Sequence, residues 1–139
     1  MYTNNEYKIY VIVNNKYEPA VILNASCHLI AGLVYQIQDK IPFHVYQNKD
    51  GKVAANISHY PIVVLKAKNN NQLLNVIHAS VENSINYNFF TDTMISSSAE
   101  EQISQTYQTS IDDIEFIGVA IFGETKLLNQ FTKKFSVYK

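Results

Sequence analysis

Three side chains that can act as nucleophile or base follow one another at Ser26, Cys27 and His28. The surrounding pattern predicts a helix, whose consecutive residues point about 100° apart, so these three cannot form a nucleophile and base pair with one another. Asn24 lies one turn before His28, and the two side chains could line a pocket at the helix surface. The alternatives are an interior histidine bonded to a backbone carbonyl and a cysteine that acts as a small buried hydrophobe.

Thr91 is a further candidate because it follows the aromatic end, Phe89-Phe90, of a predicted strand. In a sheet covered by helices, strand ends and adjacent helix N-termini form the usual ligand crevice. The alternative is that Thr91 caps a helix or turn. We therefore expect a ligand site beside the first helix, lined by Asn24 and His28 with help from Thr91.

The other histidines, His44, His59 and His78, lie on separate predicted elements and lack the spacing of metal ligands. A metal site would need tertiary contacts to assemble it, and we expect none, nor any cofactor. The chain has no Gly-rich phosphate loop, no Gly-x-Ser-x-Gly elbow and no kinase motif. His59 stays a candidate ligand-binding residue if the fold brings it to the first helix.

The composition is that of an ordinary globular protein, with 47% hydrophobic and 17% charged residues. The 139 residues suit a single domain, which we expect to span 1–139. All 11 basic residues are lysine, so the chain cannot present the planar, bidentate fork of arginine to phosphate or guanine. With a formal net charge of −1, we expect no strong nucleic-acid footprint.

The single cysteine excludes an intrachain disulfide and a multi-cysteine zinc site. Residues 1–7 are polar and lack the apolar core of a signal peptide. No apolar run approaches the ~20 residues of a membrane span. We expect a soluble, cytoplasmic protein that does not associate with membranes.

Three short apolar runs, Ile9–Val13, Ile62–Leu65 and Ile117–Phe122, are separated by stretches with helical periodicity. A strand buried on both faces is apolar at every position, so the pattern predicts a sheet between two helix layers. The first helix should begin at Glu18-Pro19 and run to about Gln38. Its sheet-facing residues are predicted to be Ile22, Ala25, Leu29, Leu33 and Gln36 to Ile37.

The remaining segments give shorter signals. Phe43–Gln47 followed by an Asn-Lys-Asp-Gly turn predicts a hairpin, and Tyr87–Phe90 predicts a strand. A second helix is predicted from about Gln72 to Asn83, capped by Asn69–Asn71, and one of its faces carries Leu73, Leu74, Ile77 and Val81. A third helix is predicted to be capped by Ser96–Ser98 and to run through Ile103 and Tyr107. A short helix is predicted over Thr125–Phe131. Gly118 should be a packing requirement, and Gly123 a turn that needs positive φ.

The segment Val11–Gly32, with its Ser-Cys-His triplet, resembles the opening strand and first helix of type II peptidyl-tRNA hydrolases, and Ile117–Tyr138 resembles their closing segment. The middle resembles a narrower family, domain of unknown function 2000, in Asp50-Gly51 and in Tyr60-Pro61 with the apolar run after it. Further matches are Phe90-Thr91, Tyr107, Gly118 and Gly123. The resemblance implies an α/β fold, a three-layer α/β/α sandwich with a mixed sheet of about four strands.

This chain differs from the hydrolases at positions that their activity depends on. If His28 is aligned with the histidine of their helix, their catalytic lysine falls at Val21, and Ser110–Phe116 replaces their Asp-Ala-Gly-Arg-Thr-Gln segment. We therefore expect a non-hydrolase that binds a small molecule, a peptide end or a protein partner near the first helix. The alternative is a hydrolase of an ester or amide, with His28 as base and Thr91 or Asn24 positioning the substrate. A homodimer is also expected, because relatives of this fold are often dimeric and aromatic residues are plentiful.

Overall fold

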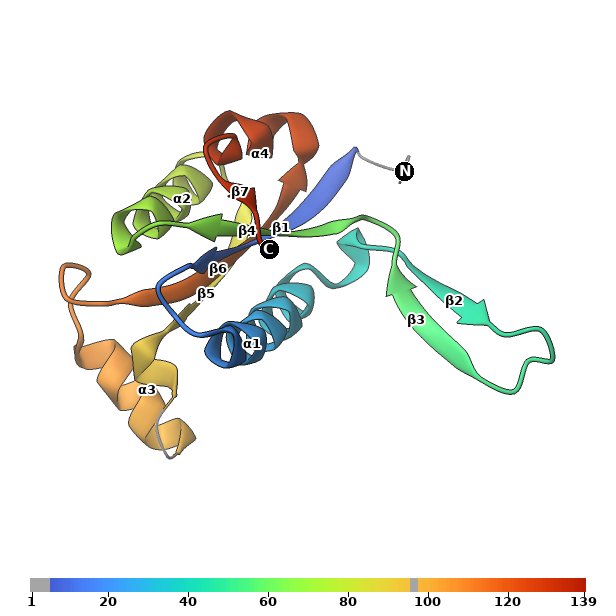
Figure 1. The fold of residues 1–139 in the computed structure, drawn as a ribbon, viewed down its shortest axis with the longest axis horizontal. Helices are drawn as coiled ribbons and strands as arrows, with labels where there is room; N and C mark the ends of the chain where they lie inside the picture. Colours follow the sequence, from blue (N-terminus) through green and yellow to red (C-terminus); the bar gives the residue numbers. More distant parts are fainter. Residues whose placement is uncertain (1–5, 96–97) are drawn as a thin grey trace.

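A five-stranded mixed sheet forms the centre of the molecule (Figure 1). The structure is a computed structural model that describes residues 6–95 and 98–139. The strands are β1 (Tyr7–Asn14), β4 (Ile62–Ala67), β5 (Asn86–Thr91), β6 (Phe116–Glu124) and β7 (Ser136–Val137), in the order β5-β6-β1-β4-β7. β1 and β4 run parallel, and the other neighbouring pairs run antiparallel. About four strands were predicted; the fifth, β7, has two exposed residues, too few to give an apolar pattern.

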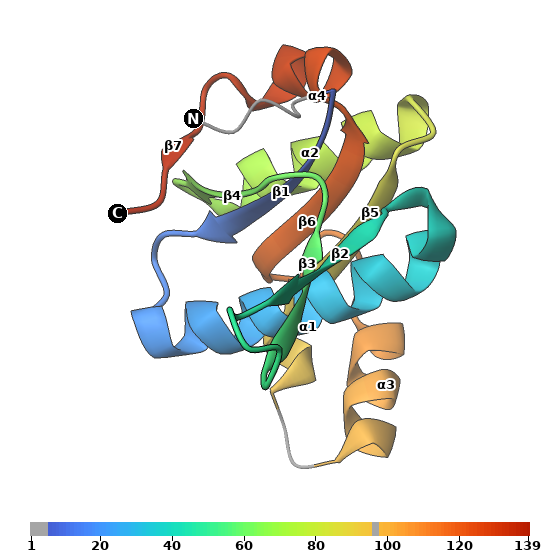
Figure 2. The ribbon, with the colours of Figure 1, turned by 90° about the vertical axis from the view of Figure 1, so that its right-hand side faces the viewer.

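Helices cover both faces of this sheet (Figures 1 and 2). α1 (Pro19–Ile37) packs on one face, and α2 (Asn70–Glu82) and α4 (Thr125–Thr132) pack on the other. This confirms the prediction of a sheet between helices. The predicted core face of α1 is confirmed except at Gln36, which is exposed; the buried residues are Ile22, Ala25, Leu29, Leu33 and Ile37.

The core face of α2 differs in part from the prediction. Its N-cap is confirmed, because the side chain of Asn69 accepts a hydrogen bond from the Gln72 N–H at 3.0 Å. The prediction that Val81 belongs to the buried face was wrong, since Val81 is 58% exposed. Ser80 takes the buried position instead, because its hydroxyl donates to the Val76 carbonyl at 2.8 Å, which satisfies it inside the helix.

The predicted apolar run in β4 is less buried than expected. β1 and β6 are almost completely buried, but Ile62 is 46% exposed and only Leu65 and Ala67 of β4 are buried. The reason is the position of β4, whose outer neighbour β7 pairs only with Leu65 and Lys66. The first half of β4 is therefore close to a sheet edge.

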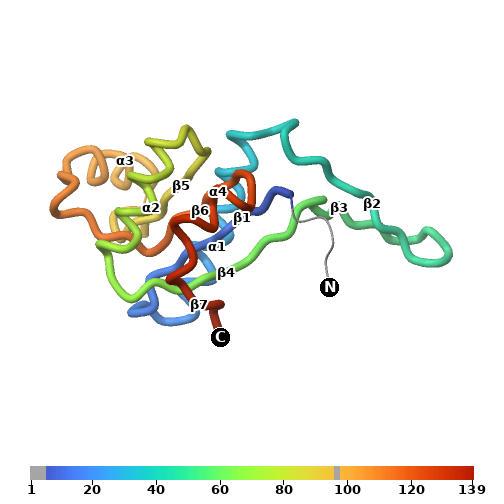
Figure 3. Tube along the Cα trace, turned by 90° about the horizontal axis from the view of Figure 1, so that it is seen from above, coloured from blue at the N-terminus to red at the C-terminus, as the bar shows by residue number. Residues whose placement is uncertain are grey.

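The predicted hairpin is confirmed, and it forms a separate two-stranded sheet of β2 (Phe43–Gln47) and β3 (Ala54–Ser58). Gly51 has φ +70° at the turn, as its Asp-Gly step indicates. The hairpin projects from the rest of the molecule (Figures 1 and 3). A short 3-10 turn, Gln38–Lys40, leads from α1 into it.

The two glycine predictions have different outcomes: Gly118 is confirmed as a packing position, whereas Gly123 is not a turn. A Cβ at Gly118 would lie 2.9 Å from Leu29 Cδ1 and 3.1 Å from the Ile12 carbonyl oxygen. The prediction of positive φ at Gly123 was wrong, because β6 continues through it to Glu124. α4 starts directly afterwards, and the Thr125 N–H donates to the Glu6 carbonyl.

The helical stretch Pro19–Lys40 is long and apolar enough to cross a membrane by length and composition alone, contrary to the expectation that no such run exists. In the structure this stretch covers the sheet with one face. Its other face carries apolar and uncharged polar residues, and α1 has no charged residue at all. A helix that buries one side and carries no charge on the other has the length and apolar composition of a membrane span.

Candidate functional site

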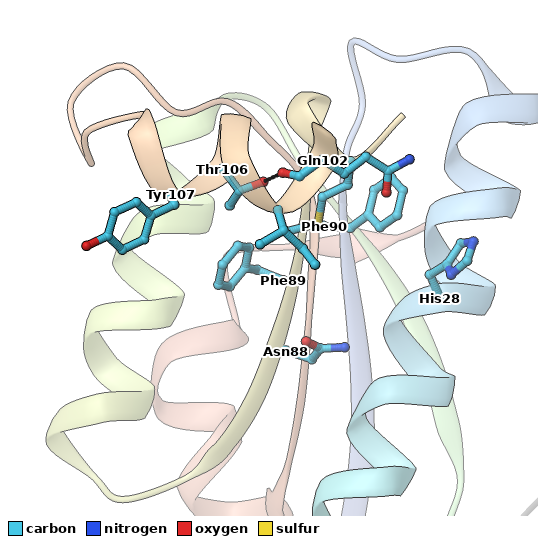
Figure 4. Close-up of a pocket in the computed structure, with 9 residues that line it drawn as sticks. His28, Asn88, Phe89, Phe90, Gln102, Thr106 and Tyr107 are labelled. Carbon is cyan, nitrogen blue, oxygen red and sulfur yellow. Dashed lines mark hydrogen bonds between the residues drawn. The ribbon is translucent and has the colours of Figure 1, made fainter. Parts of the chain in front are cut away.

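A cavity of about 630 Å³ lies between α1, the end of β5 and α3 (Ala99–Gln108), as Figure 4 shows. Most of its lining is apolar, with a few polar groups, which is the usual make-up of a small-molecule or peptide site. The lining residues are His28, Asn88, Phe89, Phe90, Met94, Gln102, Ile103, Thr106 and Tyr107.

Hydroxyl groups connect α3 to the end of β5. Thr91 Oγ1 lies 2.7 Å from Thr93 Oγ1, which lies 2.7 Å from Thr106 Oγ1. The Thr106 hydroxyl also donates to the Gln102 carbonyl oxygen at 2.7 Å (Figure 4). Ser98 is the N-cap of this helix, because its hydroxyl accepts a hydrogen bond from the Glu101 N–H. Residues 96 and 97 of the predicted cap lie outside the described residues. Thr91 is completely buried in this chain, so it shapes the wall of the cavity from behind.

His28 lies on the α1 wall of the cavity. Its ring stacks on Phe90, with the centroids 5.5 Å apart and the planes at 20°. The side chain is exposed, and none of the hydrogen bonds of residues 6–95 and 98–139 joins the imidazole to a hydroxyl. The alternative of an interior histidine is therefore wrong. The prediction of a buried Cys27 is also wrong, because Ala25 and Leu29 occupy the core positions of that turn.

Asn88 is held at the floor of the cavity by a close approach between α1 and β5. Its Nδ2 donates to the Leu29 carbonyl oxygen at 3.2 Å. Gly32 makes this approach possible, since a Cβ there would lie 2.3 Å from Asn88 Nδ2. A helix residue without a side chain is thus needed for the strand amide to reach the helix backbone.

Asn24 lies one turn before His28, as predicted, and lines a smaller cavity of about 240 Å³ next to the first. The two cavities share Phe90. Val21, the position aligned with the hydrolase lysine, also lines the smaller cavity. The structure therefore brings Asn24 and His28 to the same side of α1, with Thr91 buried behind them.

His59 lies apart from these residues, next to the hairpin. Its Nδ1 is 2.7 Å from His44 Nε2, and its ring packs edge-on against Tyr60. It lines none of the cavities described above. Within the described ranges, no three His, Cys, Asp or Glu side chains gather in a way that could hold a metal ion.

The elements that form the main cavity carry negative charges and no positive one. α1 and β5 carry no charged residue, while the turn after β5 and α3 contribute Asp92, Glu100 and Glu101. Residues 69–125 include no lysine. The lysine that comes before α1, Lys16, forms an ion pair with Glu115.

The pKa of Tyr17 is raised above its ordinary value, first by burial and second by the carboxylate of Asp92. We expect the Asp92→Asn variant to lower the pKa of Tyr17 while leaving it above that of an exposed tyrosine, since burial remains. The raised value means that Tyr17 favours folding below pH ~10, an effect lost as the pH rises through the folded pKa. Carbon-13 NMR titration of labelled tyrosine, assigned with Tyr17→Phe, measures this; an unchanged pKa would contradict it.

The sequence alone did not single out the residues that α3 adds to the cavity. Ile103 and Tyr107 were predicted to lie on a helix, and they are 70% and 91% exposed. Their spacing of four residues places both on one side of that helix. An exposed apolar pair on a helix with few other apolar residues is the signal that could have marked them.

Comparison with known proteins gives a family and a fold. The profile of the family described as "Protein of unknown function (DUF2000)" matches residues 7–139. The solved structure of the protein of unknown function Atu0240 from Agrobacterium tumefaciens strain C58 superposes with a TM-score of 0.84 at 23% sequence identity, covering 96% of this chain and 98% of the other. That similarity shows the fold alone. No curated protein matches the chain.

Proposed function

We propose that this chain, which belongs to the DUF2000 family, is a binding protein that takes an apolar ligand with a neutral or cationic head group into the cavity between α1, β5 and α3. Peptide amino termini and small organic amines have this chemistry. The kinship with type II peptidyl-tRNA hydrolases, the single domain and the cytoplasmic location are parts of the same proposal.

One observation carries the proposal: a mostly apolar cavity with aromatic side chains in its lining, formed by elements that carry carboxylates and no lysine. Aromatic faces and nearby carboxylates favour a cation, since both attract positive charge. A phosphate would meet neither a lysine nor an arginine there, because the lining elements contain none. The amino terminus of a peptide with an apolar first residue combines the two features that this cavity favours.

The same observation supports binding over hydrolysis of peptidyl-tRNA. That substrate carries phosphates close to the scissile ester, and Val21 replaces the lysine that the hydrolases use. The hydrolase alternative depends on His28 as base. Thr91 is bonded to Thr93 behind the cavity wall, and His28 stacks on Phe90, so neither group is placed against the other.

Short peptides test the proposal. We expect tetrapeptides with a free amino terminus and an apolar first residue to raise the melting temperature, and their N-acetylated forms and inorganic phosphate to have little effect. His28→Ala and Ile103→Ser should weaken peptide binding at least tenfold, about 1.4 kcal/mol. Both side chains are exposed, so the variants should fold with a loss below about 1.5 kcal/mol.

Ile111→Ser is the matched control, because Ile111 is 54% exposed and lies outside the cavity. It should bind the peptides like the parent protein. Equal binding by His28→Ala, Ile103→Ser and the control would refute the site. Turnover of peptidyl-tRNA or of a simple ester that disappears in His28→Ala would instead establish the hydrolase alternative.

A further inference from the structure

The β2–β3 hairpin is an exposed, apolar arm that the rest of the chain does not cover. Every residue of the two strands except Ser58 is exposed. Isolated two-stranded hairpins are marginally stable in water, and soluble monomers rarely expose large contiguous apolar patches. The exposed apolar residues of the arm are Phe43 (46%), Val45 (65%), Tyr46 (58%), Val53 (66%) and Ile57 (45%).

The outer side of α1 continues this apolar surface. Leu23 is 68% exposed, Cys27 is exposed, and Ile30 and Val34 are half-buried. These residues recur at helical spacing and form one stripe. A cavity of about 380 Å³ joins the stripe to the arm, since Ile30 and Val34 line it together with residues of both hairpin strands. Figure 1 shows the arm projecting beyond the C-terminal end of α1.

The total surface of the chain indicates how much of it a partner would cover. A compact monomer of 15.9 kDa is expected to expose about 7,400 Å². The chain exposes 8905 Å², an excess of about 1,500 Å² over that expectation. Obligate homodimers bury on the order of 1,000 to 2,500 Å² on each protomer. An excess of this size is large enough to include the surface that one protomer contributes to a stable dimer.

The distribution of charge suits contact with a second copy of the chain. In a twofold contact each patch meets itself or its symmetry mate, so a charge near the axis faces a like charge. α1 has no charged residue, and the strands of the arm have none either. The charges of the hairpin, Lys49, Asp50 and Lys52, are confined to its turn, where Lys52 pairs with Asp50.

We infer that two copies of this chain associate through the hairpin and the outer stripe of α1, the arm of each protomer lying against α1 of its partner. This interface specifies the surface of the expected homodimer and does not depend on the ligand cavity. It also gives the arm the apolar cover that a two-stranded sheet lacks by itself.

Sedimentation equilibrium of the full chain at 1 to 100 µM tests the inference. We expect twice the chain mass of 15.9 kDa for the parent protein. Val45→Lys on the arm and Leu23→Lys on α1 should each weaken association at least 100-fold, because each places like charges in the contact. Val81→Lys on α2 is the control, with an exposure of 58% against 65% for Val45, and it should remain dimeric.

Circular dichroism should show that all three variants keep the helix content of the parent, which separates dissociation from unfolding. A parent protein that is monomeric at 100 µM would overturn the inference. It would also be overturned by a dimer that neither Val45→Lys nor Leu23→Lys weakens, or that Val81→Lys weakens equally. A tighter complex with a different protein that excludes the second copy would likewise show that the surface has another occupant.

Discussion

Replacing Gly118 by valine is expected to lower the free energy of unfolding by about 3 kcal/mol or more, as severe overpacking does in cores. Gly118 lies in the middle of β6 and is buried, so an added side chain could not turn toward solvent. A Cβ there would lie 2.9 Å from Leu29 Cδ1 and 3.1 Å from the Ile12 carbonyl oxygen. The leucine side chain can shift, but the carbonyl belongs to the neighbouring strand β1, so the sheet itself would have to move.

Gly123→Val is the matched control within the same strand. A Cβ at Gly123 would first meet Leu128 Cδ2, at 3.2 Å, which is the end of a side chain that can change its rotamer. The expected loss is about 1 kcal/mol, near the average for point substitutions. Urea unfolding of both variants measures the difference. Equal losses would show that contact with the strand backbone is not what excludes a side chain at Gly118.

Gly118 also connects the core to the candidate site. The Leu29 side chain packs directly over Gly118, and the Leu29 carbonyl oxygen accepts the hydrogen bond from Asn88. A valine that pushes Leu29 outward would move this part of α1 away from β5. We therefore expect Gly118→Val to impair ligand binding even at temperatures where the variant remains folded.

The sequence predicted the centre of the fold because the centre is dominated by burial. β1 and β6 are apolar at nearly every position since both of their faces are covered. The core face of α1 follows from the 3.6-residue period, and the hairpin from the local chemistry of an Asp-Gly turn. These signals lie within one segment and need no knowledge of neighbours.

Features set by neighbouring segments were predicted less well. β4 looks like a buried strand in sequence, but its exposure is set by the short β7 from the other end of the chain. Gly123 looks like a turn because a helix follows, yet β6 continues through it. Cys27 is apolar enough to be buried, but the turn it belongs to already supplies Ala25 and Leu29 to the core.

The candidate site was predicted on its α1 side and missed on its α3 side. Asn24 and His28 share a helix face, which a period alone reveals. The contribution of Ile103 and Tyr107 depends on where α3 packs, and that position is set by the Thr91, Thr93 and Thr106 hydroxyls across two segments. No local pattern indicates such a connection.

Replacing Asn14 by aspartate should have the second large effect, with a pH dependence that identifies its cause. Asn14 is completely buried at the end of β1. Its Nδ2 donates to the Phe116 carbonyl oxygen at 3.0 Å, and its Oδ1 accepts from the Lys16 N–H at 3.3 Å. A carboxylate cannot donate to Phe116, so the variant would bury a charge against a carbonyl oxygen. The expected loss at pH 7 is about 3 to 5 kcal/mol.

The sign of the pH dependence follows from burial, which raises the pKa of the new carboxyl in the folded state above the ~3.9 of an unfolded aspartate. Below pH ~3.9 the carboxyl is protonated in both states and can donate to Phe116, so most of the loss should disappear there. As the pH rises, the unfolded state ionises first and the variant loses stability until the folded pKa is passed. Asn14→Ala, which removes the same hydrogen bonds without adding a charge, should lose stability by an amount that does not change with pH. Urea unfolding of both variants from pH 3.5 to 8, each compared with the parent protein, measures this difference. Parallel curves for the two variants would mean that the loss at Asn14→Asp comes from the missing hydrogen bond and not from a buried charge.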